Sequence, residues 1–181
     1  MPVAASSTTT NEVVVVQEQE DASLGGQIAK HNENWVVLER VVLKLSDRNI
    51  LLNDLCLNDK HIFYVQLLIK KQFPSVLGLK STLIAERHGK VLPQHGLQVL
   101  LVRDNHWILL STMGCPQGSV KVYDSTFINQ STCALKAVAK ALITTEQTVR
   151  IAFVDTELQP TATDCGIYVC SCHDDDYCLW W

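Results

Sequence analysis

Concentrated positive charge is missing from this sequence. Its longest basic run is the pair Lys70-Lys71, and the formal net charge of its 181 residues is −4 at pH 7. Proteins that bind nucleic acid through the phosphate backbone carry clustered lysines and arginines. We therefore expect no direct contact with nucleic acid.

Long apolar runs and a secretory signal are missing too. No apolar stretch approaches the roughly 20 residues of a membrane span, and residues 1–7 lack the basic start and apolar core of a signal peptide. The seven cysteines, an odd number, then indicate free thiols in a reducing compartment. We expect an intracellular protein of the nucleus or cytoplasm, with no membrane contact, cofactor or metal.

Residues 1–34 differ from the rest of the chain in composition and in the spacing of apolar residues. They contain a Ser/Thr run at 6–10 and an acidic patch at 18–21, without a sustained period, which predicts a disordered tail. From Trp35 onward, apolar residues recur at the spacings of strands and helices. Residues 35–181 are therefore predicted to form one domain.

The order of elements in this domain indicates an α+β fold with a mixed or antiparallel sheet and flanking helices. Residues 35–45 look like a strand, followed by a helix capped at Ser46-Asp47, and Asn58 is placed to cap a second helix that ends near Gln72. Residues 75–96 are predicted mainly as loop, with a short turn at 81–86. The remaining prediction is strands at 97–103, 106–112 and 119–124, a helix at 131–145 and a strand at 149–154.

Cys165 stands where a polar loop changes into an apolar run, the pattern of a thiol at the start of a helix. Free backbone N–H groups and the helix dipole favour a thiolate there. Gln159, six positions upstream, is a neutral donor that together with the Cys165 backbone N–H suits a developing oxyanion. The alternative is a buried structural cysteine.

His106 is the candidate base. If the strands at 106–112 and 119–124 form a hairpin, His106 lies opposite residue 124 or 125, within one residue of register. Asp124 then orients the imidazole and leaves its other nitrogen free to act as a base. Asp104, two residues from His106 on the same strand face, is the competing partner.

Taken together, these motifs resemble the ubiquitin-like-protein-specific cysteine proteases, the deSUMOylating group of papain-like peptidases. The resemblance spans about residues 45–172, and some motifs (57–62 and 78–82) are similar to versions carried by animal transposable elements. The matching pieces are Leu57-Asn58-Asp59, Asn105-His106-Trp107, Val122-Tyr123-Asp124-Ser125, and Gln159 with Asp164-Cys165-Gly166.

The resemblance implies a papain-like fold and hydrolysis of peptide or isopeptide bonds after the Gly-Gly tail of a SUMO-like partner, by a monomer. It implies four catalytic roles: Cys165 is the nucleophile, His106 the general base, Asp124 the residue that orients His106, and Gln159 the oxyanion donor. It also implies a narrow substrate channel at Trp107, Cys56, Asn58 and Asp59.

Two features depart from that family. SUMO-processing members have Trp where this chain has Cys56, and their domain continues well past the nucleophile, whereas this chain ends 16 residues after Cys165. We therefore expect a short C-terminal part and weak or absent activity. The alternative function is a ubiquitin-like-protein binding module without turnover. A zinc site built from Cys170, Cys172, His173 and Cys178 is a third possibility, although Cys-x-Cys is tighter than the usual ligand spacing.

Overall fold

The computed structural model describes residues 33–102, 105–126 and 132–171. The predicted tail at 1–34 lies almost wholly outside the described residues, as do Asp104 and residues 172–181. In chain order the elements are β1 (Asn34–Leu38), β2 (Val41–Lys44), α2 (Leu45–Leu52), α3 (Asp59–Gln72), β3 (Leu77–Gly78), α4 (Thr82–His88), β4 (Gly96–Val102), β5 (His106–Ser111), β6 (Ser119–Tyr123), α5 (Thr132–Ala141), β7 (Arg150–Val154) and α6 (Cys165–Ser171).

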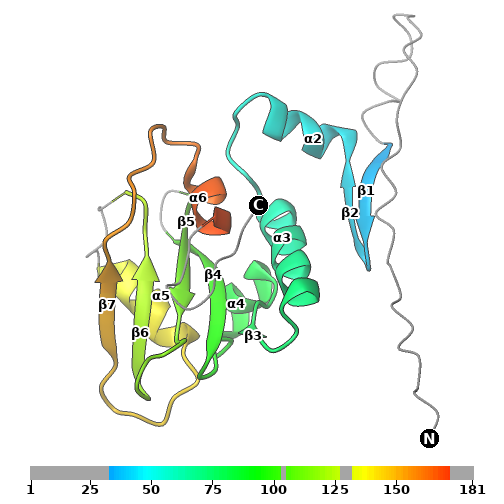
Figure 1. The fold of residues 1–181 in the computed structure, drawn as a ribbon. Helices are drawn as coiled ribbons and strands as arrows, with labels where there is room; N and C mark the ends of the chain where they lie inside the picture. Colours follow the sequence, from blue (N-terminus) through cyan, green and yellow to red (C-terminus); the bar gives the residue numbers. More distant parts are fainter. Residues whose placement is uncertain (1–32, 103–104, 127–131, 172–181) are drawn as a thin grey trace, which may run out of the picture.

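A five-stranded mixed sheet forms the centre of the molecule (Figure 1). Its order is β3-β4-β5-β6-β7, with antiparallel pairing of β5 to β4 and β6 and parallel pairing at both edges. Residues 96–100 of β4 are buried because the strand lies inside the sheet and is covered on both faces, whereas Leu101 near its end is exposed. The predicted mixed sheet is confirmed.

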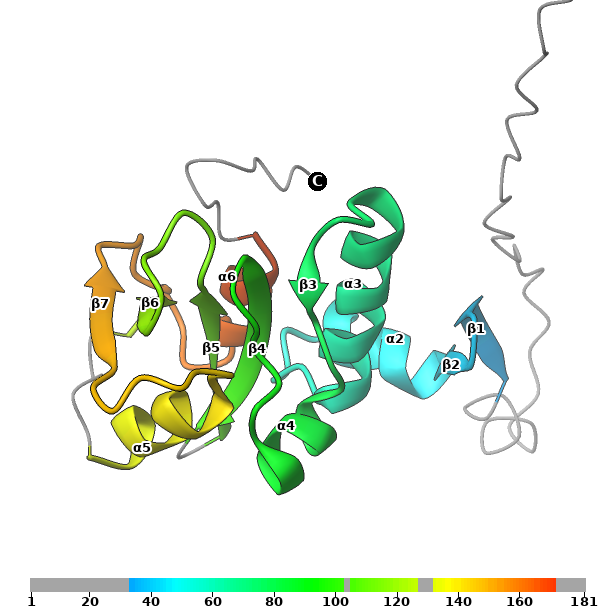
Figure 2. The same cartoon turned by 90° about the horizontal axis from the view of Figure 1, so that it is seen from below.

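Helices cover both faces of this sheet, and alternate strand residues pack against each layer. On one face Trp107 and Leu109 of β5 join the core formed with α3 and α6. On the other face Ile108 and Leu110 pack with α5 and α4. Figure 2 shows α5 and α6 on opposite sides of the sheet. Trp107 and Cys165 therefore lie together in the core on the face covered by α3 and α6.

The segment at 35–45 is a hairpin rather than one strand. Glu39 has a φ of 54°, which turns the chain between β1 and β2, and the two strands pair with each other alone. Helix α2 also begins earlier than predicted, with Lys44 as its N-cap. Asp47 is the third residue of this helix, where its carboxylate accepts the Lys44 backbone N–H at 2.9 Å.

Asn58 caps α3 as predicted, because its Oδ1 accepts the backbone N–H groups of Lys60 at 3.0 Å and His61 at 3.4 Å. His61 completes this cap. Its ring is buried, Nδ1 accepts the Asn58 backbone N–H at 3.4 Å, and Nε2 donates to the backbone carbonyl of Asp47 at 3.0 Å. His61 therefore ties the start of α3 to α2.

Two further boundaries differ from the sequence prediction. The short turn at 81–86 is helix α4, which carries a wall of the pocket described below. Helix α5 ends at Ala141 instead of near residue 145. Within the part of the chain that the structure describes, no helix is long and apolar enough to cross a bilayer.

We expect Asn58→Ala to lower the free energy of unfolding by about 1 kcal/mol, because it removes the side-chain cap on the Lys60 and His61 backbone N–H groups of α3. Urea denaturation followed by circular dichroism measures the change. Asn53→Ala is the matched control, since the side chain of Asn53 bonds only the exposed backbone carbonyl of Asn49. Equal losses in the two variants would contradict the structural role assigned to Asn58.

Candidate active site

Cys165 is the first residue of α6, and only 2% of its surface is exposed. Gly166 permits this position: a Cβ on Gly166 would lie 2.8 Å from Leu57 Cβ, so any larger residue would push the helix away. The Leu57 backbone carbonyl in turn accepts the Trp107 indole N–H at 2.9 Å. Close packing against Leu57 thus fixes α6 relative to β5.

His106 and Asp124 are hydrogen-bonded although they are not directly opposite each other on strands β5 and β6. His106 Nε2 donates to Asp124 Oδ1 at 2.8 Å. The β5–β6 ladder pairs Leu109 with Tyr123 and Ser111 with Lys121, so the same register continued to His106 reaches Thr126. The expected register of 124 or 125 is therefore wrong by one or two residues, although the predicted pair forms.

Thr126 explains how Asp124 is held. Both the backbone N–H and the hydroxyl of Thr126 donate to Asp124 Oδ1 at 2.9 Å, and Thr126 Oγ1 lies 3.3 Å from His106 Nε2. The Asp124 backbone carbonyl accepts the Thr156 hydroxyl at 2.9 Å. The carboxylate is therefore fixed at the end of β6. The competing partner, Asp104, lies outside the described residues.

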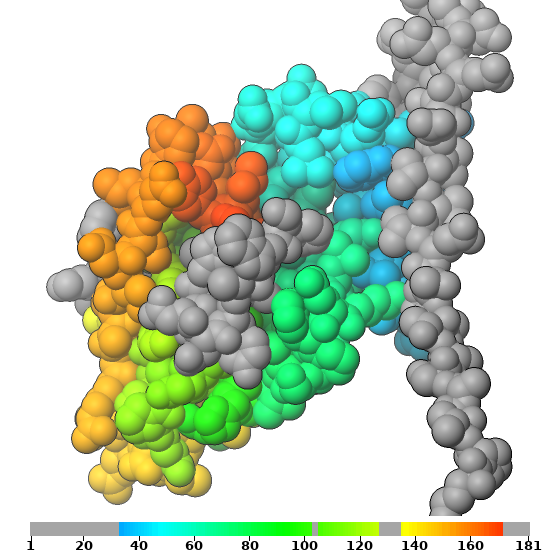
Figure 3. All heavy atoms as spheres, in the orientation of Figure 1, coloured from blue at the N-terminus to red at the C-terminus, as the bar shows by residue number. Residues whose placement is uncertain are grey.

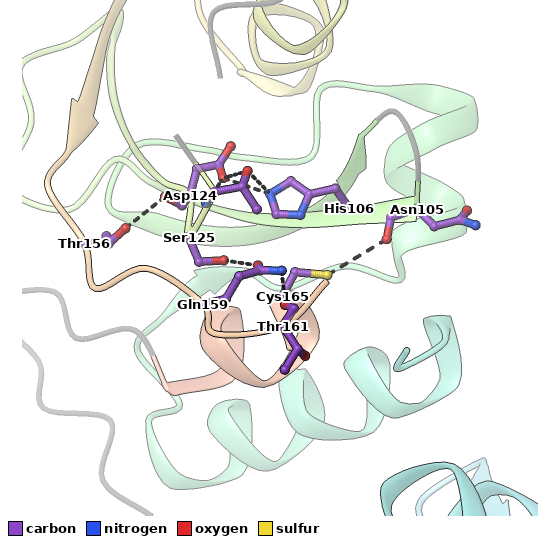
Figure 4. Close-up of polar contacts among 9 residues, drawn as sticks. Asn105, His106, Asp124, Ser125, Thr156, Gln159, Thr161 and Cys165 are labelled. Carbon is purple, nitrogen blue, oxygen red and sulfur yellow. Dashed lines mark hydrogen bonds and ion pairs between the residues drawn. The ribbon is translucent and has the colours of Figure 1, made fainter. Parts of the chain in front are cut away.

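Nε2 is occupied by Asp124, so Nδ1 is the His106 nitrogen left for the thiol. Figure 4 shows Asp124 at one side of the His106 ring and the Cys165 sulfur near the other. The thiol also lies 3.9 Å from the backbone carbonyl oxygen of Asn105, which can accept a hydrogen bond from it. Asp124, His106 and Cys165 form a chain of polar groups that leads to the sulfur.

The electrostatics favour an imidazolium–thiolate pair. Burial lowers the pKa of His106, but its hydrogen bonds to Asp124 and Cys165 and their negative charge outweigh burial and raise that pKa to about 9. Burial raises the pKa of the Cys165 thiol, whereas hydrogen bonds from His106 and from the Trp107 and Gly166 backbones hold it below the ordinary value. The pKa of Asp124 is likewise lowered, since His106 and Thr126 outweigh burial.

Gln159 lies at this site with its amide already engaged. Its Nε2 donates to the Thr161 backbone carbonyl at 2.6 Å, and its Oε1 accepts the Ser125 hydroxyl at 2.6 Å. The Gln159 backbone N–H donates to the Ser125 carbonyl at 3.1 Å, which ties this loop to the end of β6. Each amide nitrogen carries two hydrogens, so one donor of Gln159 is not used by these contacts.

One pocket near the start of α3 has a volume of about 320 Å³. All four predicted channel residues line it: Trp107, Cys56, Asn58 and Asp59. Asn105, whose carbonyl faces Cys165, also belongs to its wall. Figure 3 shows α6 at the surface between the loop after β7 and the segment around α2. The predicted channel residues therefore meet in one cavity, which is not lined by Cys165 itself and is linked to its sulfur through Asn105.

Sequence reasoning assigned no role to several residues of this site. Ser125 and Thr126 directly follow Asp124, and an Asp followed by hydroxyl residues at a strand end is a signal for side-chain-to-backbone turns. No sequence pattern marks Leu57 as part of the site, because its importance depends on its contact with Gly166 in the folded chain. The α4 wall of the pocket was hidden in a stretch predicted mainly as loop.

The proposed zinc ligands are not brought together by anything described. Cys170 lies on α6 and is half-buried, while Cys172, His173 and Cys178 lie outside the described residues. Among the residues that the structure describes, no three His, Cys, Asp or Glu side chains are grouped as a metal site.

Comparison with known proteins identifies the fold of this chain. No family model and no curated protein sequence matches this chain. Solved structures do: the SUMO protease Ulp1 with its catalytic cysteine oxidized to a sulfonic acid is 18% identical, with a TM-score of 0.60, over 81% of this chain and 77% of that one. The chain has the fold of a ubiquitin-like-protein protease domain.

Two more solved structures agree. The C-terminal Ulp1 protease domain in complex with Smt3, the yeast ortholog of SUMO, gives a TM-score of 0.58 at 20% identity, over 80% of this chain and 78% of that one. The sulfinic acid form of Ulp1 gives 0.59 at 19% identity over 88% and 84%. The structural similarity establishes a shared fold despite the low sequence identity, so the predicted papain-like α+β class is confirmed. The transposable-element likeness and the short C-terminal part stay predictions.

We expect His106→Ala to slow alkylation of Cys165 by iodoacetamide at pH 7 roughly ten-fold, because loss of the imidazolium raises the pKa of the thiol. Peptide-resolved mass spectrometry measures Cys165 separately from the other cysteines. His88→Ala, a change at an exposed residue of α4, is the control and should leave the rate unchanged. An unchanged rate in His106→Ala would show that the thiolate does not depend on this ring.

Proposed function

We propose that this protein is a cysteine peptidase that hydrolyses peptide or isopeptide bonds after the C-terminal Gly-Gly of a ubiquitin-like, SUMO-like protein. The observation that carries the proposal is the arrangement of Cys165, His106 and Asp124 at one end of the sheet. The three residues occur in a fold that is shared with the SUMO protease Ulp1.

In this mechanism the Cys165 thiolate attacks the carbonyl carbon of the last glycine, and its electron pair forms a thioester when the C–N bond breaks. The His106 imidazolium gives its Nδ1 proton to the leaving amine. The neutral ring then takes a proton from the water that hydrolyses the thioester. Asp124 keeps Nε2–H in place, so Nδ1 always faces the reacting atoms.

Gln159 and backbone N–H groups are the proposed donors to the oxyanion. The Gly166 and Trp107 backbones already favour negative charge on the Cys165 sulfur. Gln159 would use its second amide hydrogen while Thr161 and Ser125 hold the group in place. A pre-positioned amide of this kind stabilises charge without reorganisation during the reaction.

The channel supplies the preference for glycine. Trp107 is buried in its wall, and Cys56, Asn58 and Asp59 lie across the same pocket. A tail without side chains can pass close to the indole and reach the buried sulfur. Cys56 is exposed, and a cysteine is much smaller than a tryptophan, so this side of the channel is wider than in the SUMO-processing relatives.

A binding module without turnover is the second candidate, favoured by one contact. The Gln159 amide donates to Thr161 at 2.6 Å, and a donor that stays there contributes little to an oxyanion. Such a module would keep the channel and bind the Gly-Gly tail without cleaving the bond after it.

Reaction with a panel of ubiquitin-like proteins that carry a C-terminal Gly-Gly electrophile separates these candidates. We expect covalent labelling of wild type by a SUMO-like probe and none of Cys165→Ala, because Cys165 is the activated thiol. Cys170→Ala, a change in the same helix, is the matched control and should still label. Labelling that persists in Cys165→Ala would sink the assignment, and tight binding without labelling would favour the module.

Turnover should decline as the pH rises through about 9, the pKa of His106, because the proton donor to the leaving amine is then lost. The raised pKa means that the protonated ring is present below this pH and absent above it. Alkylation of Cys165 should not decline there, since the thiolate survives loss of the imidazolium proton. Parallel pH profiles of hydrolysis and alkylation test this, and profiles that fall together would contradict it.

A further inference from the structure

One wall of the pocket is formed by α4, which carries no predicted site residue. Thr82, Leu83 and Glu86 of α4 line the pocket together with the channel residues. A Gly-Gly tail that enters between Cys56 and Trp107 leaves room on this side for a side chain of the residue that precedes it. The chemistry of α4 therefore bears on which tails are accepted.

Two carboxylates, Asp59 and Glu86, line this pocket. Among the described residues neither is part of an ion pair, since Lys60 pairs with Asp47 at 4.0 Å and Lys140 donates to the backbone carbonyl of Glu86 at 2.9 Å. Carboxylates at the mouth of a cavity favour a positively charged ligand. Their charge repels an acidic tail.

Thr82 gives an independent indication of a ligand. It is 5% exposed, it belongs to the wall, and its Oγ1 has no hydrogen-bond partner within the described ranges. Buried hydroxyls are nearly always paired, so an unpaired one beside a cavity points to a partner that binds there. Leu83, Leu101 and Trp107 supply apolar walls for an aliphatic stem.

We propose that this pocket receives a cationic side chain, best an arginine, from the residue immediately before the Gly-Gly tail, and that Glu86 is the residue that recognises it. An arginine combines an apolar stem with a planar group that has five donors, which suits leucine walls, two carboxylates and one free hydroxyl. The inference rests on the proposed function and narrows its substrate class to ubiquitin-like tails with a basic residue at that position.

Fluorogenic X-Gly-Gly-aminocoumarin peptides test the subsite when X is arginine or citrulline, its neutral isostere. We expect wild type to prefer arginine about three- to five-fold in kcat/KM, the range of a solvent-accessible ion pair. Glu86→Gln should abolish the preference, and salt should weaken it in wild type. Glu146→Gln removes the same charge from an exposed residue between α5 and β7 and should keep the preference.

Binding measurements keep this test independent of turnover. Full-length Cys165→Ala is titrated with fluorescein-labelled tails that end in Arg-Gly-Gly or citrulline-Gly-Gly, with and without Glu86→Gln. Tighter binding of the arginine tail that disappears in Glu86→Gln supports the subsite even if no substrate is cleaved, which would overturn only the proposed peptidase activity. Equal affinity for both tails, or a preference that survives Glu86→Gln, overturns the subsite.

Thr82→Val provides a second variant with the same shape and no hydroxyl. We expect it to melt at a temperature at least as high as wild type, because it removes an unpaired buried oxygen, and to bind the arginine tail more weakly. A lower melting temperature with unchanged binding would show that Thr82 serves the fold alone and would remove it from the subsite.

Discussion

The contact between Leu57 and Gly166 is the constraint on which the rest of the site depends. A helix can approach a neighbouring side chain this closely only where it lacks a Cβ, and the approach is what buries the Cys165 thiol. Leu57 also accepts the Trp107 indole N–H and directly precedes the cap of α3. One leucine therefore sets the positions of the nucleophile's helix, the channel tryptophan and the helix that lines the pocket.

The polar groups of the site are organised from the opposite side, at the end of β6. Asp124 is held by Thr126 and Thr156 before it meets His106, so the carboxylate does not have to be ordered by the histidine. A fixed carboxylate raises the pKa of the imidazole more than a mobile one, because it loses no conformational freedom on forming the bond. The apolar contact at Leu57 and this polar cluster meet at Cys165 from different elements of the chain.

The sequence was sufficient for the type of fold and for the pairing of His106 with Asp124, because strand periodicity and turn residues are local signals. It was insufficient for the register, since Asp124 contacts His106 from beyond the last pair of the β5–β6 ladder. The break at Glu39 was missed because β-branched residues continue on both sides of it. Helix α4 was hidden by the glycines and prolines around it.

Long-range contacts were the least predictable. His61 looks like an ordinary first-turn residue, yet its ring is buried because α2 passes over it, which no local pattern indicates. Leu57 and Thr82 gained their significance from residues that are far away in sequence. The motif that the sequence did carry, Asp-Cys-Gly, has a glycine whose purpose becomes visible only when Leu57 is placed against it.

The depth of the Cys165 thiol has a further consequence for the cell that makes this protein. A sulfur with 2% of its residue exposed cannot meet a peptide bond on the surface of a folded protein or within an ordinary loop, whose side chains would collide with the channel walls. Under the proposed function, the depth of the thiol alone would therefore restrict cleavage to narrow, extended chain ends.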